Sequence, residues 1–252
     1  MSAAAPKLRA ILLVAGVGRR LGAERPKSLL EFGGRSLLMR HVDALASVGA
    51  TSLTLVVGHL QEQIREEIAR HAPALPIEFR VNEHYREGSV VSLWSARDAL
   101  SSSEATLVMD GDVLYPPSLL ARLRDGGGES ALLVDRRSEE TGEEMMVGVR
   151  GGRALTIARR VYAGDDDGPW DSVGESVGFL KVGPAHAAPL REALEAHVAA
   201  GHRNTEYEAV YATFMRAHAV GVVDVGDVPW TEIDFEEDVR RAREEVLPAI
   251  GG

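Results

Sequence analysis

The stretch Leu13-Val14-Ala15-Gly16-Val17-Gly18-Arg19-Arg20-Leu21, with Pro26-Lys27 shortly after it, decides how this chain folds. It follows residues 8–14, a mostly apolar run whose length is typical of a buried strand. Glycines directly after such a strand predict a loop at the end of the strand, and the helical pattern that follows predicts an α/β unit. The chain is therefore expected to begin with a strand and a glycine-rich loop.

The composition of this loop indicates that it binds an anion. Gly16 and Gly18 let the backbone bend tightly and bring its N–H groups against negative charge, and Arg20 and Lys27 add two cations. A dinucleotide-binding fingerprint needs a third glycine where Leu21 stands, and the spacing of a P-loop is absent as well. The loop is predicted to bind phosphate groups, and the alternative is a plain turn between a strand and a helix.

Short apolar runs alternate with helical periods along residues 1–115, which favours β-α-β units and a largely parallel sheet. Ser36 is predicted to begin the first helix and Gly49 to end it. The predicted strands are 8–14, 53–57, 77–81 and 105–109, and the predicted helices are 37–48, 60–68 and 90–100.

The remainder of the chain has a more mixed pattern after the loop at 126–128. Residues 165–167, three aspartates between glycines, predict a solvated acidic loop, and a movable lid is the alternative. The chain is expected to form a single α/β domain, 1–252, with an elaborated C-terminal half. In that half the predicted strands are 131–134, 145–149, 176–182 and 220–225, and the predicted helices are 187–200, 206–218 and one after Asp234.

The charge balance and the absence of cysteine exclude several classes of protein. The 252-residue chain has 38 Asp and Glu against 28 Lys and Arg, so its formal net charge is −10. Without cysteine there is no disulfide framework, thiolate metal site or thiol nucleophile. The acidic balance disfavours nucleic acid or an anionic membrane as a partner. No signal peptide or membrane span is visible, so we expect a cytoplasmic protein.

Four further motifs follow the glycine-rich loop. With the Gly-x-Gly-x-Arg loop and Pro26-Lys27, they resemble the nucleotidyltransferase superfamily, and most of all its bacterial phosphocholine, phosphonate and inositol-phosphate cytidylyltransferases. The resemblance covers roughly residues 8–243, and it departs from the family pattern at Val14 and in the short gap before Pro26. The motifs are Glu87-Gly88-Ser89, Gly111-Asp112-Val113, Gly174-Glu175-Ser176-Val177-Gly178-Phe179 and Trp230-Thr231-Glu232-Ile233-Asp234.

This resemblance implies a Rossmann-like, mostly parallel sheet flanked by helices, of the nucleotide-diphospho-sugar transferase type. It implies a nucleotide-binding half at 8–115 and an acceptor-binding half at 116–252. The implied reaction is the Mg²⁺-dependent transfer of CMP from CTP to a small phosphate or phosphonate, with release of pyrophosphate, and a homodimer is left open. Arg20 and Lys27 are the implied catalytic cations, and the implied nucleotide-binding residues are Ala15, Gly16, Gly18, Gly88 and Ser89.

Asp112 and Asp234 are the predicted metal ligands. Asp112 follows a predicted strand, so it is expected at the carboxyl edge of the sheet, where α/β proteins bind ligands. Two carboxylates that converge there suit Mg²⁺ held together with phosphate oxygens. The alternatives are a turn aspartate at 112 and a helix N-cap at 234.

An aromatic and acidic set is expected to bind the acceptor. Tyr207, Glu208, Trp230 and Glu232 would suit an ammonium group, such as that of phosphocholine or 2-aminoethylphosphonate. The alternative is that the tyrosine at 207 is a core residue of a helix. Lys181, if it reaches the same pocket, would instead favour a second anionic group, such as the carboxylate of phosphonoformate.

Other functions remain as alternatives at this point. They are a phosphonoformate or inositol-phosphate cytidylyltransferase, a nucleoside-diphosphate-sugar pyrophosphorylase, and a non-catalytic nucleotide-binding module. The Glu-Ile-Asp ending at 232–234 tells against the second, and the presence of Lys27 and both aspartates tells against the third.

Overall fold

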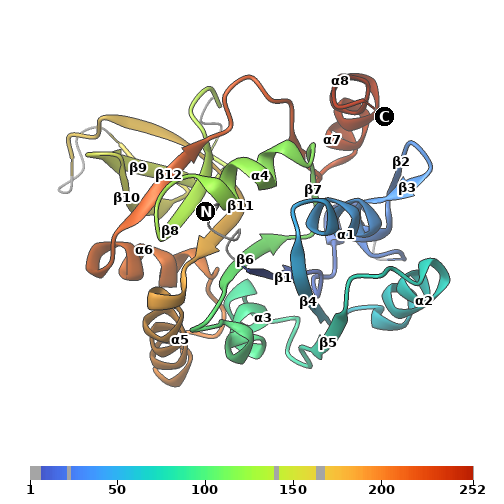
Figure 1. Ribbon diagram of the computed structural model, residues 1–252, viewed down its shortest axis with the longest axis horizontal. Helices are drawn as coiled ribbons and strands as arrows, with labels where there is room; N and C mark the ends of the chain where they lie inside the picture. The colour runs from blue at the N-terminus through green and yellow to red at the C-terminus, as the bar shows by residue number, and fades with distance from the viewer. Residues whose placement is uncertain (1–6, 22–23, 139–141, 163–167, 252) are drawn as a thin grey trace, which may run out of the picture.

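The computed structural model describes residues 7–251 except 22–23, 139–141 and 163–167. The expectations for the first six residues and for the three-aspartate loop therefore lie outside the described residues. A nine-stranded sheet in the order β5-β4-β1-β6-β11-β8-β12-β10-β9 forms the centre of the molecule (Figure 1). Its strands are β1 Leu8–Leu13, β4 Ala50–Val57, β5 Ile77–Val81, β6 Ala105–Asp110, β8 Ser130–Asp135, β9 Met146–Arg150, β10 Arg153–Ala158, β11 Ser172–Val182 and β12 Val220–Asp224.

The first half of the sheet is parallel, as predicted. β1 lies between β4 and β6, and β4 pairs with β5, all in parallel register. The carboxyl ends of these strands therefore meet at one edge of the sheet, and the glycine-rich loop leaves β1 there. This confirms the mixed α/β fold with a mostly parallel sheet in its N-terminal half.

β11 joins the two halves of the sheet. It pairs antiparallel with β6, β8 and β9, while β12 is parallel to β8 and antiparallel to β10. Because β10 also pairs with β9, the strands β11, β8, β12, β10 and β9 close into a ring of hydrogen-bonded pairs. The strand order of this half could not be predicted from its apolar runs.

Helices cover both faces of the sheet (Figure 1). α1, α2 and α4 pack on one face, and α3, α5 and α6 on the other. Successive strand residues point to opposite faces, so that Leu12 packs with the first group and Ile11 with the second. The helices are α1 Leu37–Ser47, α2 Gln61–His71, α3 Ser89–Ser95, α4 Ser118–Asp125, α5 Pro184–Ala199, α6 Glu208–Ala217, α7 Glu236–Arg241 and α8 Leu247–Ala249.

The predicted helix boundaries agree with the structure in part. The Ser36 hydroxyl accepts a hydrogen bond from the Met39 N–H, which makes it the N-cap of α1 as predicted. The helix predicted at 90–100 was too long, because α3 ends at Ser95 and a 3-10 turn, Arg97–Ala99, follows. None of the helices in the described part of the chain combines the length and apolar character that crossing a bilayer requires.

Two short ribbons stand beside the sheet. β2 Glu31–Phe32 pairs with β3 Arg35–Ser36, and β7 Val113–Leu114 pairs with β13 Thr231–Glu232. Strands of two residues carry no periodic signal, so sequence patterning could not predict them. The second ribbon positions the site described next.

Candidate active site

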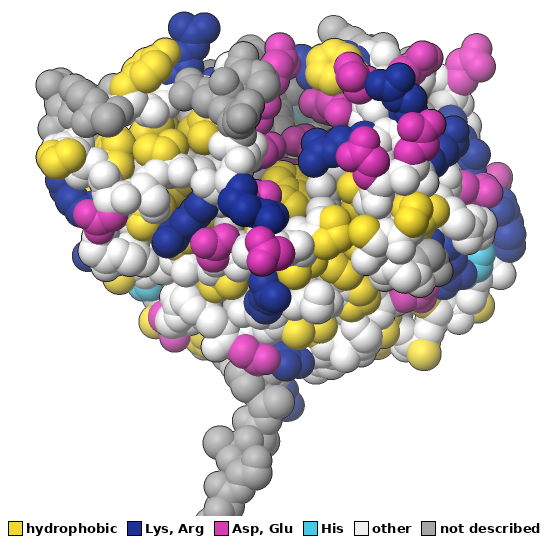
Figure 2. All heavy atoms as spheres, turned by 90° about the horizontal axis from the view of Figure 1, so that it is seen from above, with side chains coloured by type: hydrophobic (Ala, Val, Ile, Leu, Met, Phe, Trp, Pro, Cys, Tyr) yellow, Lys and Arg dark blue, Asp and Glu magenta, His cyan; other side chains and the backbone are white. Residues whose placement is uncertain are grey.

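A cavity of about 420 Å³ opens between the loop after β1, the carboxyl end of β6 and the start of α6. In the space-filling view, acidic side chains gather around a hollow on the upper face (Figure 2). Two arginines, Arg20 and Arg159, line this cavity against many more carboxylates. The carboxylates in the lining are Glu87, Asp110, Asp112, Glu143, Glu206, Glu208, Glu232 and Asp234.

The β7–β13 ribbon brings the predicted metal ligands together. Asp112 directly precedes β7, and Val113 lies opposite Glu232 in the antiparallel pair. The Ile233 N–H donates to the Asp112 carbonyl at 2.9 Å. The ribbon therefore fixes Asp112 beside Glu232 and Asp234, although the two segments are far apart in the sequence.

The Asp234 side chain faces the cavity and does not cap α7. The backbone N–H groups of Asp234 and Phe235 both donate to the carboxylate of Asp238, at 2.9 and 2.8 Å. The Asp238 side chain thus pairs the backbone N–H groups at the start of α7, and the N-cap alternative for Asp234 is wrong. Its carboxylate instead accepts from Lys27 and Arg20.

Lys27 reaches the carboxylates from the phosphate loop. Its Nζ lies 3.4 Å from Asp112 Oδ2 and donates a shorter hydrogen bond to Asp234. Burial lowers the pKa of Lys27, but the attraction of Asp112 and Asp234 outweighs burial and raises that pKa above its ordinary value. Lys27 therefore stays charged at neutral pH.

Three carboxylates provide donors for a divalent cation. Asp112, Glu232 and Asp234 each offer an oxygen, and these oxygens lie within 4.8 Å of one another. Burial raises the pKa of Asp112, Lys27 opposes that rise, and the neighbouring Asp234 adds to it. Hard oxygen donors in this number fit Mg²⁺, which takes its other ligands from phosphate and water. The sequence analysis assigned Glu232 to the acceptor, whereas the structure places it with the predicted metal ligands.

The glycine-rich loop closes the other side of the site. Gly18 has φ +63°, and a Cβ there would lie 3.0 Å from Lys27 Cγ, so a side chain would strain the loop and press on the lysine. A Cβ on Gly16 would meet no atom within 4 Å, which leaves open space for a ligand. The Ala15 carbonyl accepts from the His59 N–H at 3.1 Å, and this bond ties the loop to the end of β4.

Arg20 is held by acidic groups at the rim. Its Nη1 lies 3.0 Å from Asp234 and its Nη2 3.3 Å from Glu143. Gly88 and Ser89 line the cavity as well, at the start of α3. The structure thus brings Gly16, Arg20, the two aspartates and the Gly-Ser turn to one cavity, while Gly18 and Lys27 line a small pocket that shares Gly16 and Asp112 with it.

The cavity lining includes a buried carboxylate that was not predicted from the sequence. Asp110 accepts a hydrogen bond from the Tyr207 hydroxyl, and burial together with Asp112 and Glu208 raises the pKa of Asp110 well above its usual range. Burial also raises the pKa of Glu208 to about 7. The signal available was the Asp-Gly-Asp sequence at 110–112, because alternate residues at a strand end can face the same side.

Arg159 is a second residue that the sequence analysis missed. It lies just after β10, ion-pairs with Glu206, and donates to the Glu143 carbonyl at 2.7 Å. β10 was not predicted, so nothing in the sequence directed attention to this arginine. It gives the cavity lining a second positive charge besides Arg20.

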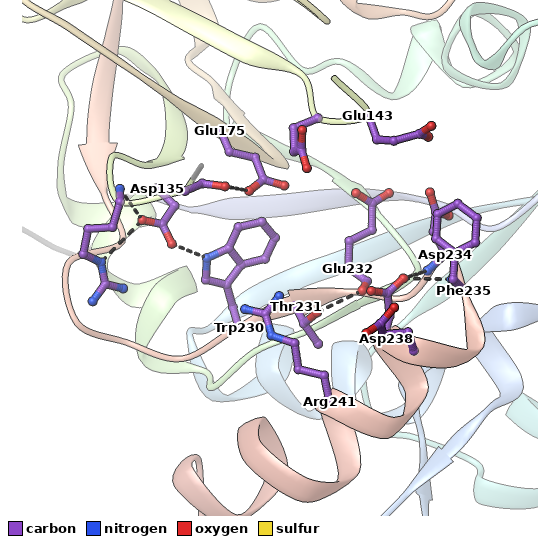
Figure 3. Close-up of a pocket in the computed structure, with 14 residues that line it drawn as sticks. Asp135, Glu143, Glu175, Trp230, Thr231, Glu232, Asp234, Phe235, Asp238 and Arg241 are labelled. Atoms are coloured by element: carbon purple, nitrogen blue, oxygen red, sulfur yellow. Dashed lines mark hydrogen bonds and ion pairs between the residues drawn. The ribbon is translucent and has the colours of Figure 1, made fainter. Parts of the chain in front are cut away.

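Two predicted acceptor residues lie elsewhere. Lys181 is 5% exposed, and its Nζ donates to the carbonyls of Arg124 and Gly126 at the end of α4, so the expectation that it reaches the pocket is wrong. The alternation of side chains along β11 directs Lys181 towards α4 and away from the cavity. Trp230 lines a neighbouring cavity of about 730 Å³, where its Nε1 donates to Asp135 at 2.9 Å (Figure 3).

Comparison with known families adds to this geometry. Residues 10–211 match the model of the MobA-like NTP transferase domain, which is most of the chain. The chain belongs to this family. The resemblance inferred from the motifs is thereby confirmed.

Curated relatives of the chain include an enzyme named for an aminopropylphosphonate and one named as an IPC transferase. CMP-5'-(3-aminopropyl)phosphonate synthase of Streptomyces rubellomurinus is 29% identical over 93% of this chain and 38% of its own length. A bifunctional IPC transferase and DIPP synthase of Rubrobacter xylanophilus is 31% identical over 94% of this chain and 52% of its own length. The chain thus spans about half or less of the length of these relatives.

Two solved structures have the same fold. The inositol-1-phosphate CTP transferase from T. maritima superposes with a TM-score of 0.77 at 22% identity, covering 98% of this chain and 96% of that chain. The CTP:phosphocholine cytidylyltransferase from Streptococcus pneumoniae has a TM-score of 0.72 at 18% identity, covering 94% of this chain and 98% of that chain. At these identities the likeness establishes the architecture.

Proposed function

We propose that the protein is a CTP-dependent cytidylyltransferase that couples CMP to a small phosphate or phosphonate and releases pyrophosphate. The observation that carries this proposal is the meeting of Lys27, on the glycine-rich loop, with Asp112, Glu232 and Asp234 at one end of a ligand-sized cavity. Cations and metal-binding carboxylates at the end of a phosphate loop are what phosphoryl-group chemistry requires.

In the proposed reaction an acceptor oxygen attacks the α-phosphorus of CTP. The new P–O bond forms as the bond from the α-phosphorus to the bridging oxygen breaks, and pyrophosphate leaves with that electron pair. The acceptor oxygen is already anionic at neutral pH, so no general base is needed. The work of the protein is to position the two anions and to neutralise developing charge.

Each part of the site has a role in this scheme. The loop N–H groups at Gly16 and Gly18 hold the triphosphate with Arg20, and Lys27 stabilises charge on the α-phosphate and the leaving group. Asp112, Glu232 and Asp234 would hold Mg²⁺. The ion supplies charge neutralisation for the phosphate oxygens.

The acceptor in this proposal carries an ammonium group. Glu206, Glu208 and Asp110 line the same cavity and are not needed for the metal. Burial and neighbouring carboxylates raise the pKa of both Asp110 and Glu208, so each would gain from a nearby cation. An ammonium would favour their charged forms, while Arg159 would face the phosphonate. The name of the Streptomyces relative, an aminopropylphosphonate synthase, supports this class of acceptor.

A pyrophosphate-release screen tests the proposal. The four nucleoside triphosphates would each be paired with 2-aminoethylphosphonate, 3-aminopropylphosphonate, phosphocholine, phosphonoformate, inositol 1-phosphate and glucose 1-phosphate. The expected result is turnover with CTP and an aminoalkyl acceptor, abolished by a chelator. Turnover only with UTP and a sugar phosphate would contradict the proposal. Turnover with CTP and inositol 1-phosphate, but with no aminoalkyl acceptor, would support cytidylyl transfer and contradict the ammonium-bearing acceptor.

A further inference from the structure

Two segments that contribute to the cavity lining are joined directly. One is Glu87–Ser89 at the start of α3, and the other is 203–208, which leads into α6 and lines the cavity with residues 206–208. The Gly88 N–H donates to the Arg203 carbonyl at 2.8 Å, and the Tyr207 N–H donates to the Ser89 hydroxyl at 3.1 Å. Each segment therefore satisfies backbone groups of the other.

An ion pair reinforces this junction. Arg203 Nε lies 2.6 Å from one carboxylate oxygen of Glu87, and its Nη2 lies 3.2 Å from the other. Two parallel N–H···O bonds fix both distance and orientation. The bond from Arg203 lowers the pKa of Glu87, so this carboxylate remains ionised at neutral pH.

The fit at Gly88 leaves no room for the segments to slide. A Cβ on Gly88 would overlap the Thr205 carbonyl oxygen, and the Val90 N–H also donates to that carbonyl at 3.2 Å. The Thr205 hydroxyl in turn lies 2.7 Å from His197 Nε2 on α5. A displacement of the Gly88–Ser89 turn must therefore displace the chain at 203–207.

We infer that Arg203 is a positioning residue that couples the nucleotide-binding turn at 87–89 to the acceptor-binding segment at 203–208. Under this inference, a nucleotide that settles against Gly88 and Ser89 orders Tyr207 and Glu208, so the acceptor binds more tightly once the nucleotide is in place. This rests on the proposed function, because it takes the two ends of the cavity to be the nucleotide and acceptor ends. Coupling between two sites is reciprocal, so the acceptor also tightens nucleotide binding.

Hydrogen exchange with CTP and Mg²⁺ alone tests the coupling without an acceptor. In the wild type, CTP is expected to slow amide exchange about fivefold or more in peptides covering both 85–92 and 203–211. In Arg203→Ala, CTP should still slow exchange at 85–92 but slow it only about half as much at 203–211 as in the wild type, because the backbone hydrogen bonds between the segments remain. Arg203→Lys, which keeps the charge but loses the two-pronged geometry, should lie between them.

The matched control is Arg97→Ala. Arg97 makes a similar ion pair, 3.0 Å from Glu195, and its side chain is 30% exposed against 31% for Arg203, but it is not among the described residues that line the cavity. In Arg97→Ala, CTP should slow amide exchange at 203–211 as much as it does in the wild type. Equal protection of 203–211 in wild type and Arg203→Ala would overturn the role of Arg203, and no protection there in the wild type would overturn the coupling itself.

Failure of the proposed function gives a different pattern. If none of the four nucleotides slows exchange at 85–92, the nucleotide site is wrong and the coupling is overturned with it. A kinetic readout separates positioning from folding: with a melting temperature near the wild type, Arg203→Ala should raise the KM for 2-aminoethylphosphonate about tenfold at saturating CTP, with a smaller change in kcat.

Discussion

Lys27 is the residue on which the proposed chemistry depends most directly, because its ion-pair partners, Asp112 and Asp234, are also the groups that would hold the metal. We expect Lys27→Ala to lower kcat roughly 10²- to 10³-fold, since the charge is needed most where negative charge develops in the transition state. Steady-state kinetics check this, together with CTP affinity, which should change far less.

Arg25→Ala is the control for that substitution. Arg25 is a nearby cation that pairs with Glu31, 3.2 Å away. It is not among the described residues that line the cavity or the small pocket beside it, which Lys27 lines. Its variant should keep wild-type turnover. If Lys27→Ala retained more than half of the wild-type kcat, the role given to Lys27 would be lost.

The three clustered carboxylates should act as one unit. Asp112→Asn and Asp234→Asn are each expected to abolish Mg²⁺-dependent turnover, and the double variant should be hardly worse than either single one. Calorimetric titration with Mg²⁺ or Mn²⁺ should show lost affinity in all three, and in Glu232→Gln. Asp227→Asn, at a fully exposed site, serves as the control. If the losses of turnover in the two single variants multiplied in the double variant, the two aspartates would not share one ion.

Glu208 should make stability depend on pH. Its pKa is raised from the ordinary 4.5 to about 7, so the folded state holds the proton more tightly than the unfolded state. The contribution of Glu208 to the free energy of unfolding is full below pH 4.5. It is lost as the pH rises towards about 7, which lowers the free energy of unfolding by up to about 3 kcal/mol. Urea unfolding from about pH 4.5 to 8 should therefore show a decline in the wild type that is smaller in Glu208→Gln.

The same ionisation should govern the acceptor. An ammonium favours the charged carboxylate, so binding of 2-aminoethylphosphonate should strengthen as the pH rises through about 7. Phosphonate ionisation contributes to the same trend, and Glu208→Gln isolates the part due to the carboxyl. Identical pH profiles in the two proteins would remove Glu208 from the acceptor site.

Individual residues were predictable where the chemistry of the side chain and its place after a strand agreed. Asp112 and the glycines of the loop lie where strand β6 and strand β1 end, and periodicity places those ends, whereas Lys27 was predicted from its place after Pro26 in the family motif. Asp110 was passed over because one aspartate sufficed for the turn, and its burial depends on the approach of Tyr207 from the start of α6. A contact between two segments that are far apart in the sequence leaves no pattern in the sequence of either segment.

At the level of elements, α4 and β11 explain what Lys181 does. The lysine donates to two carbonyls at the end of α4, where the helix dipole is negative. We expect Lys181→Met to reduce the free energy of unfolding by about 1–3 kcal/mol while the KM for the acceptor is unchanged. Denaturant unfolding and steady-state kinetics of the same preparation measure the free energy of unfolding and the KM. A KM raised several-fold with no loss of stability would mean that Lys181 contacts the acceptor after all.

The β7–β13 ribbon marks the limit of prediction for the elements. Most long strands and amphipathic helices were found within a few residues of their true bounds, because burial of one face imposes a period, but α4 and β10 were not predicted. The ribbon has two residues in each strand, and its partners are brought together by the surrounding fold. The strand order around β8 to β12 was beyond reach for the same reason, since it is set by pairing between distant segments.

At the level of the whole molecule, ligands that bind only the folded state should stabilise it. Mg²⁺ with CTP is expected to raise the free energy of unfolding by about 2.7 kcal/mol at a hundredfold excess over Kd. Thermal scans with CTP and Mg²⁺, with CTP and chelator, and with ATP and Mg²⁺ check this. Equal shifts from all three mixtures would show that neither the metal nor the base is recognised.

β11 has a practical consequence for anyone who wishes to divide this protein. It hydrogen-bonds with β8 on one side and with β6 and β9 on the other, so both halves depend on a single strand for their inner edges. A fragment ending near residue 115 would leave β6 with an uncovered row of amide and carbonyl groups, a template for aggregation. Split reporters or fragment-complementation assays that cut the chain near residue 115 should thus yield insoluble fragments. A break in an exposed turn such as Gly151-Gly152 would leave the pairing of β11 with β6 and β8 intact.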